Sequence, residues 1–159
     1  MRICILWSGN GRVCTWGILA NNWKNILDKM TNVFRVEFKN TLPVYVWEIN
    51  KKAGSQYLRL DPVGSELLEY NSSSETREFT VQIFYYFLED NMRDGSLAHI
   101  LRTAARIEAL IHDNVAMTLS DSSSLFNCRM ETTSLDAEAD SEFYVVLWDF
   151  KAMHLGNTG

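Results

Sequence analysis

The chain has 159 residues, of which 47% are hydrophobic and 22% are charged, values that are ordinary for one soluble globular domain. Its formal net charge of −5 argues against a general role in binding polyanions, because neutralising phosphates requires clustered Lys and Arg. The three cysteines, Cys4, Cys14 and Cys128, are widely spaced and form no CxxC pair, so we interpret them as reduced, buried or bystander thiols.

The chain begins with an apolar stretch, Ile3–Trp7, that is too short for the core of a signal sequence. No segment approaches the roughly 20 apolar residues of a membrane span. We therefore expect a soluble protein that is not secreted. Residues 1–19 show no clear periodicity and are interpreted as an N-terminal arm. Trp7 and Trp16 are its candidate contacts with a neighbouring chain, because aromatic side chains are enriched at protein interfaces.

Residues 20–39 have the pattern of an amphipathic helix, with apolar side chains at steps of three and four. This stripe consists of Trp23, Ile26, Leu27, Met30, Val33, Phe34 and Phe38. Asn21 and Asn22 are alternative N-caps. Pro43 ends the helical tendency, because the residue before a proline avoids the α region. Residues 43–49 are β-branched and aromatic, and they predict a strand.

The stretch from Asn50 to Arg77 is interpreted as a long connection, punctuated by two glycines and a proline. We expect two short strands within it, over 57–60 and 67–70, followed by a polar turn over 71–74. Connections of this length are uncommon in compact domains unless they have a function.

Residues 78–89 form the clearest predicted strand. One of its faces is apolar throughout, and the other begins polar and becomes apolar from Phe84 onwards. A turn leads to a second amphipathic helix, capped by Asp94 or Ser96 and ending near residues 112–114. Its apolar stripe consists of Leu97, Ile100, Leu101, Ala104, Ile107, Leu110 and Ile111.

The C-terminal part predicts a hairpin. Residues 115–124 are interpreted as a polar link, residues 125–135 as a weakly alternating strand and residues 142–153 as a strong final strand. Residues 154–159 are expected to be a flexible tail. The predicted fold is α+β: one domain over residues 20–153, with a largely antiparallel sheet and two amphipathic helices packed on one face, plus the N-terminal arm.

No catalytic, cofactor-binding or metal-binding constellation emerges, so we expect a protein that is not an enzyme and has no cofactor. His99 and His112, thirteen residues apart on one helix, fall on different sides of it and are unable to share a metal. Asp136, Glu138 and Asp140 alternate in a short stretch that lacks the glycine and the bidentate Glu of a calcium-binding loop. We interpret them as the solvated tip of the last hairpin.

Apolar residues on the strands exceed what two helices on one face of a sheet can cover. The surplus comprises the second face of residues 78–89 together with Tyr144, Val146, Trp148 and Phe150. Two explanations stay open: the arm and the long connection cover this surface within the subunit, or neighbouring subunits cover it.

The order of elements is itself a pattern. A helix leads into PVYVW, a long connection reaches EFTVQIFYYF, a helix with LAHILRTAARIEALI follows, and EFYVVLWDF forms the last strand. Over residues 20–153 this order resembles the tail terminator or tail-completion proteins of tailed bacteriophages, also called head–tail joining proteins. Residues 1–19 are an addition to the family pattern.

The resemblance implies a virion protein that assembles in the host cytoplasm into a ring, expected to be hexameric, between tail and neck. Such a ring stops tube polymerisation and contacts the tail tube protein and a neck or head-closure protein, with no membrane involved. DNA passes through it without specific binding, and an acidic lumen containing Asp136, Glu138 and Asp140 would keep the DNA from sticking. The long connection then supplies the candidate interface residues Tyr57, Leu58, Leu60, Leu67, Leu68 and Tyr70.

Two other interpretations remain. The chain is another neck or tube component, such as a head-closure or tail-tube protein, which differs in its ring partners. Alternatively, it is a small-ligand-binding α+β domain, which requires a buried polar cluster between sheet and helices.

Overall fold

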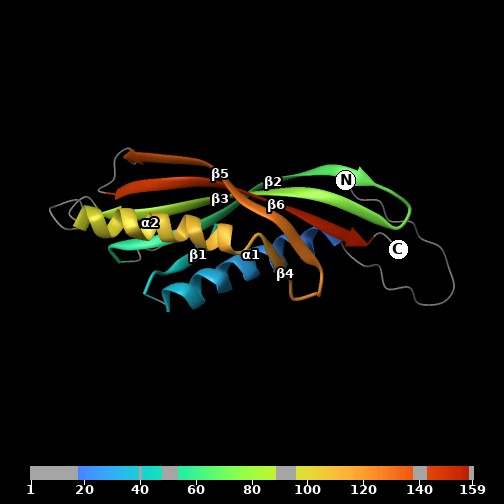
Figure 1. Ribbon diagram of the computed structural model, residues 1–159, viewed down its shortest axis with the longest axis horizontal. Helices are drawn as coiled ribbons and strands as arrows, with labels where there is room; N and C mark the ends of the chain where they lie inside the picture. Colours follow the sequence, from blue (N-terminus) through green and yellow to red (C-terminus); the bar gives the residue numbers. More distant parts are fainter. Residues whose placement is uncertain (1–17, 40, 48–53, 89–95, 138–142, 158–159) are drawn as a thin grey trace.

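Two helices and six strands make up the described part of the chain in the computed structural model (Figure 1). The structure describes residues 18–39, 41–47, 54–88, 96–137 and 143–157. The elements in chain order are α1 (Ile18–Phe38), β1 (Val44–Val46), β2 (Gln56–Tyr70), β3 (Ser74–Leu88), α2 (Ser96–Asp113), β4 (Ala116–Thr118), β5 (Ser124–Ala137) and β6 (Phe143–Asn157). The predicted α+β class is confirmed.

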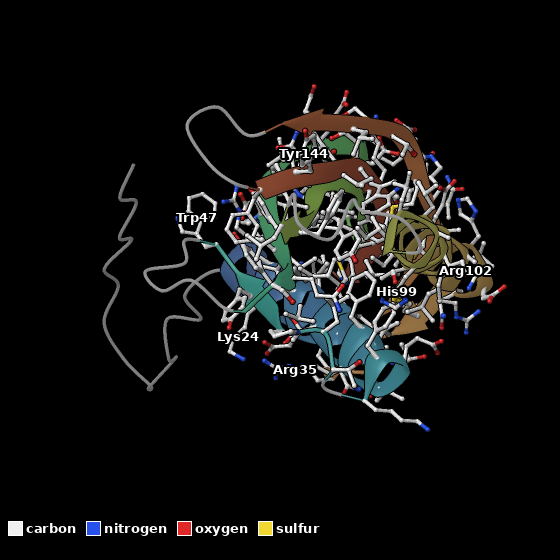
Figure 2. All side chains as sticks on the ribbon, turned by 90° about the vertical axis from the view of Figure 1, so that its left-hand side faces the viewer. Lys24, Arg35, Trp47, His99, Arg102 and Tyr144 are labelled. Atoms are coloured by element: carbon white, nitrogen blue, oxygen red, sulfur yellow. The ribbon has the colours of Figure 1, made fainter. Side chains whose placement is uncertain are left out.

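The six strands form one sheet in the order β1-β2-β3-β6-β5-β4. β1 runs parallel to β2, and the other four neighbouring pairs are antiparallel. Strands twist, and strands of 14 or 15 residues accumulate a large twist along their length. The sheet therefore curls around the interior, and α1 and α2 close its open side (Figure 2).

Both helices pack against the concave face of the sheet (Figures 1 and 2). α1 buries Ile26, Met30 and Phe34, which follow one another at four-residue steps. α2 buries Ile107 in the same core, while Arg102 lies on its solvent side (Figure 2). The two amphipathic stripes read from the sequence thus supply the helical half of the core, except that Leu97 and Leu101 of the second stripe are exposed and their prediction as core residues is wrong.

Alternate residues of the central strands complete the core. The predicted apolar face of β3 points towards the helices, and its buried Ile83 pairs with the buried Trp148 of β6. The register of this pairing decides which alternate set of β6 faces inwards. The sequence predicted that one alternate set of β6 residues lies on a second face of the sheet that the helices do not cover, and this prediction is wrong. The residues concerned, Tyr144, Val146, Trp148 and Phe150, belong to or pack against the subunit's own core.

The segment interpreted as a long connection is largely one continuous strand. β2 spans 15 residues and pairs with β3 along its whole length. The pairing shifts register between Pro62 and Gly64 and again between Leu67 and Glu69. Each shift inserts one residue as a β-bulge, which interrupts the alternation that marks a strand in a sequence.

Three further boundaries differ from the prediction. The polar link over 115–124 contains β4, which pairs with β5. β6 continues to Asn157, and its last four residues pair with β3. The predicted flexible tail over 154–159 therefore belongs to the sheet as far as Asn157. The predicted N-terminal arm, residues 1–19, lies outside the described residues up to position 17, and α1 begins at Ile18.

Candidate functional site

The β2–β3 hairpin ends in a segment that projects past the helices, here called the hairpin tip, residues 63–74 (Figure 1). Every residue from Val63 to Tyr70 is exposed. Asn71 shapes the turn, because its side-chain oxygen accepts hydrogen bonds from the backbone N–H groups of Ser73 at 3.0 Å and of Ser74 at 2.8 Å. Such an Asx turn fixes the local backbone, so the tip is a shaped projection.

The hairpin tip displays large apolar side chains. The exposed fractions are 58% for Val63, 45% for Leu67, 42% for Leu68 and 69% for Tyr70. Contiguous exposed apolar residues mark interaction surfaces more often than scattered ones do. Leu67, Leu68 and Tyr70, which the sequence predicted as interface residues, therefore lie where another protein can reach them.

The other predicted interface residues are placed differently. Leu58 and Leu60 are fully buried in the subunit's own core, so their prediction as interface residues is wrong. The reason is that the first half of β2 alternates between the core and the opposite face of the sheet. Tyr57 lies on that opposite face, half-buried among other rings. Trp7 and Trp16 lie outside the described residues.

The convex face of the sheet, against which neither α1 nor α2 packs, is called the outer face. At one end it is aromatic: the rings of Tyr57 and Tyr86 stack 4.7 Å apart, and those of Phe84 and Tyr86 stack 5.9 Å apart. The Arg59 guanidinium lies 4.4 Å from the centroid of Phe84, a cation–π contact. Phe84 and Tyr86, apolar residues of β3 on the face that the helices do not cover, thus pack against each other, and Tyr86 also packs against Tyr57.

The rest of the outer face is acidic. The strand register places seven carboxylates and three cations on this face, a formal charge of −4. They are Asp61, Glu66, Glu69, Glu78, Glu131, Asp136 and Asp149 against Arg59, Arg129 and Lys151. Sequence reasoning assigned Asp136 alone of these seven to an acidic surface, because the other six come from four strands and share a face only through strand pairing. Of the other predicted acidic residues, Glu138 and Asp140 lie outside the described residues.

Two of the three cations on the outer face are tied into a network across three strands. Arg129 Nη2 lies 2.8 Å from a carboxylate oxygen of Glu78 and 2.8 Å from one of Glu131. Lys151 Nζ lies 2.9 Å from the other oxygen of Glu131. The hydrogen bonds from Lys151 and then Arg129 lower the pKa of Glu131. These two cations neutralise the charges of Glu78 and Glu131. The electrostatic potential of this face therefore comes mainly from the exposed acids nearer the ends of the strands.

Sequence reasoning missed a polar network around the buried His154. Its Nε2 lies 2.9 Å from the Ser123 hydroxyl, which also hydrogen-bonds to Asp121. Asp121 in turn accepts a hydrogen bond from Asn25 of α1 at 3.1 Å. Burial lowers the pKa of His154. The carboxylate here contacts the serine and not the histidine, which differs from the order of a hydrolase triad. The network fastens the β4–β5 turn to α1 and β6.

The environment of the remaining cysteine, Cys128, indicates a structural role. Burial raises the pKa of the Cys128 thiol to about 11, so it stays protonated near neutral pH. Across the described ranges, no three His, Cys, Asp or Glu side chains are grouped to hold a metal ion. No helix in the part of the chain that the structure describes is long and apolar enough to cross a membrane.

A pocket of about 300 Å³ lies between the end of α1 and β1. It is lined by Arg35, Leu42, Pro43, Val44 and Tyr45. One exposed arginine on an otherwise mainly apolar wall is not the buried polar cluster that a small-ligand site requires.

Comparisons with known proteins bear on the fold. No family model matches the chain, and no curated protein matches it. A chain from the virion of a native gene transfer agent particle superposes with a TM-score of 0.60 at 12% sequence identity, over 84% of this chain and 97% of that chain. This chain shares its fold with a gene transfer agent virion component. A second solved structure, whose name states no function, matches with a TM-score of 0.57 at 14% identity, over 88% of this chain and 97% of that chain.

Proposed function

We propose that this protein is a structural component of a phage-like virion and acts as a tail terminator, a ring that caps the tail tube and joins it to the neck. The observation that carries the proposal is the fold, which extends over 97% of a chain from a gene transfer agent virion. The order of elements that resembles tail terminators supports the finer assignment. In this proposal the ring is hexameric, works without a cofactor and has no catalytic role.

The hairpin tip supports a docking role along the tail axis. It projects beyond the helices, holds its shape through its own turn and presents Leu67, Leu68 and Tyr70 to solvent. Side chains of this kind bind by insertion into a pocket or groove of a partner. We assign Leu68 and Tyr70 to contact with the tail tube protein or the neck protein, and Leu67 to contact with one of these or with a neighbouring subunit. Trp7 and Trp16 are further proposed contacts.

The acidic outer face supports a role as the wall of a DNA channel. A subunit that contributes a formal charge of −4 on one face would, when repeated around a ring, surround the channel with negative potential. DNA would then pass without binding, because nothing replaces its counterions. Asp136 lies on this face, and we propose that Glu138 and Asp140, which follow it in the chain, add to the same charge.

The mass of the purified protein in solution, followed by electron microscopy, tests the proposal. We expect rings of about six copies with a central opening, as closed cyclic symmetry requires. The same rings, mixed with tail tubes, should bind tube ends and not tube walls. A compact monomer that gains thermal stability from a metabolite would contradict the proposal and favour a ligand-binding domain.

A different position in the same particle is the second candidate, because the shared fold supports a tube or head-closure protein equally well. The three roles predict different assemblies. A tube protein polymerises into long tubes at high protein concentration, whereas a terminator stays as single rings that bind tube ends. A head-closure protein binds the neck and leaves tube ends uncapped.

A further inference from the structure

The two lateral margins of the sheet are built alike. Each ends in a strand of three residues, β1 on one side and β4 on the other. β1 pairs with Leu58–Leu60 of β2, and β4 pairs with Ser124–Phe126 of β5. Among the residues that the structure describes, no strand pairs with the outer edge of β2 over 61–70 or of β5 over 129–137. Each margin therefore combines a short strand with a long bare edge.

The strand register shows that the two short strands lie at different heights. One row of paired residues across the sheet consists of Val46, Leu60, Ile83, Trp148 and Thr133. A second row consists of Glu66, Glu78, Met153, Phe126 and Ala116. β1 therefore lies level with the bare edge of β5, and β4 lies level with the bare edge of β2.

This offset makes the two margins complementary. Suppose that a second copy continues the sheet at this margin, with its strands at the same heights and in the same directions. β1 of one copy and β4 of the other then share one strand position without colliding. β1 then faces β5 over residues 133–135, and β4 faces β2 over residues 66–67. Because β1 is parallel to β2 and three antiparallel steps separate β2 from β5, β1 meets β5 in the antiparallel sense.

Exposed apolar side chains lie at the same two places. On the β1 side, Val46 and Trp47 are 42% and 56% exposed, and Trp47 projects away from the body of the subunit (Figure 2). Leu135 on the bare edge of β5 is 53% exposed. At the other contact, Leu67 is 45% exposed and Val115, next to β4, is 58% exposed. Each proposed contact thus brings apolar side chains together from both copies.

We propose that copies of this chain join head to tail through an interlocking sheet contact, in which β1 pairs with the bare edge of β5 and β4 pairs with the bare edge of β2. This inference rests on the proposed ring and names its contact. A second copy of this chain is the partner, because β1 at one margin lies at the same height as the bare edge of β5 at the other margin. The contact uses two different surfaces of each copy, as a closed ring requires.

Pairs of cysteines test the contact, in a background with Cys4→Ser and Cys14→Ser and with the buried Cys128 unchanged. Val46→Cys protein is mixed with Thr133→Cys protein, and the sample is mildly oxidised. These positions are exposed and directly opposite in the proposed contact. Within one chain they are separated by four strand spacings, roughly 19 Å along the sheet, which is too far for a disulfide. We expect disulfide-linked pairs at least about tenfold above either variant alone.

The second contact is tested in the same way with Glu66→Cys and Ala116→Cys, which are also exposed and opposite. The matched control mixes Val46→Cys with Ala116→Cys, which lie on the two short strands at different heights and should not link. Light scattering on each sample reports assembly, and circular dichroism reports folding. Rings without either cross-link, or with Val46→Cys linked to itself, overturn the interlocking contact and leave the ring intact. Monomers at high concentration overturn both proposals.

Discussion

His154 lies buried on β6, with its ring 6.1 Å from that of Phe79 and its Nε2 against Ser123. Burial lowers its pKa, and the nearby carboxylates of Asp121 and Glu75 offset this in part. The folded protein therefore holds His154 neutral at a pH where the unfolded chain has begun to protonate it. Because the unfolded state then binds more protons than the folded state, stability falls as the pH falls below about 6.5.

We expect the free energy of unfolding to decrease between about pH 7 and about pH 5.5, and this slope to be smaller in His154→Gln. The measurement is urea unfolding followed by circular dichroism at each pH. Slopes are compared and not absolute stabilities, because the substitution also perturbs packing. Between about pH 7.5 and 8.5 the His154 contribution should be constant in the wild-type protein. Equal slopes in the two proteins at acid pH would contradict the role given to burial.

Leu58 and Leu68 are the same residue type on the same strand in opposite settings. Leu58 is fully buried and Leu68 is 42% exposed. Leu58→Ala should lower the free energy of unfolding by about 2–5 kcal/mol, because it leaves a cavity in the core. Leu68→Ala should change it by no more than about 0.5 kcal/mol. Urea unfolding of both variants checks this, and similar losses would show that β2 is placed in the wrong register.

At the scale of elements, the end of α1 contains a strained residue. Lys39 follows the helix with a φ of 49°, in the left-handed region that glycine adopts without cost. The Thr41 N–H bonds to the Phe38 carbonyl at 2.8 Å and closes the turn. Lys39→Gly should therefore raise the free energy of unfolding by up to about 1 kcal/mol, and Lys39→Ala should not. Thermal unfolding of both variants measures this; an equal gain from Ala would rule out backbone strain as the cause.

The helices were predictable because their signal is local: Ile26, Met30 and Phe34 repeat at the helical period within one segment. β2 was only partly predictable, because its two bulges break the period-two pattern and the exposed half offers no apolar alternation. The inward face of β6 depends on its register with β3, which no single segment encodes. The same is true of the acidic outer face, since Glu78 and Glu131 become neighbours only through pairing.

For the whole molecule, charge is divided between the two layers. The outer face of the sheet has a formal charge of −4, whereas residues 18–39 and 96–113, which contain the helices, carry six basic and four acidic side chains and a formal charge of +2. A ring that turns its outer faces inwards would gather the like charges of all copies around the channel. Repulsion between subunits would then oppose assembly, and the apolar margins would have to overcome it.

Salt should therefore strengthen the ring. Raising NaCl from about 50 mM to about 500 mM shortens the Debye length from more than 10 Å to less than 5 Å and screens this repulsion. We expect the protein concentration at half-assembly, measured by light scattering, to fall with added salt. The variant Glu66→Gln, Glu69→Gln, Asp136→Asn replaces three exposed acids and should assemble at lower concentration with a weaker salt dependence. If salt instead dissociates the ring, ion pairs between subunits hold it together, and the outer faces do not line the channel.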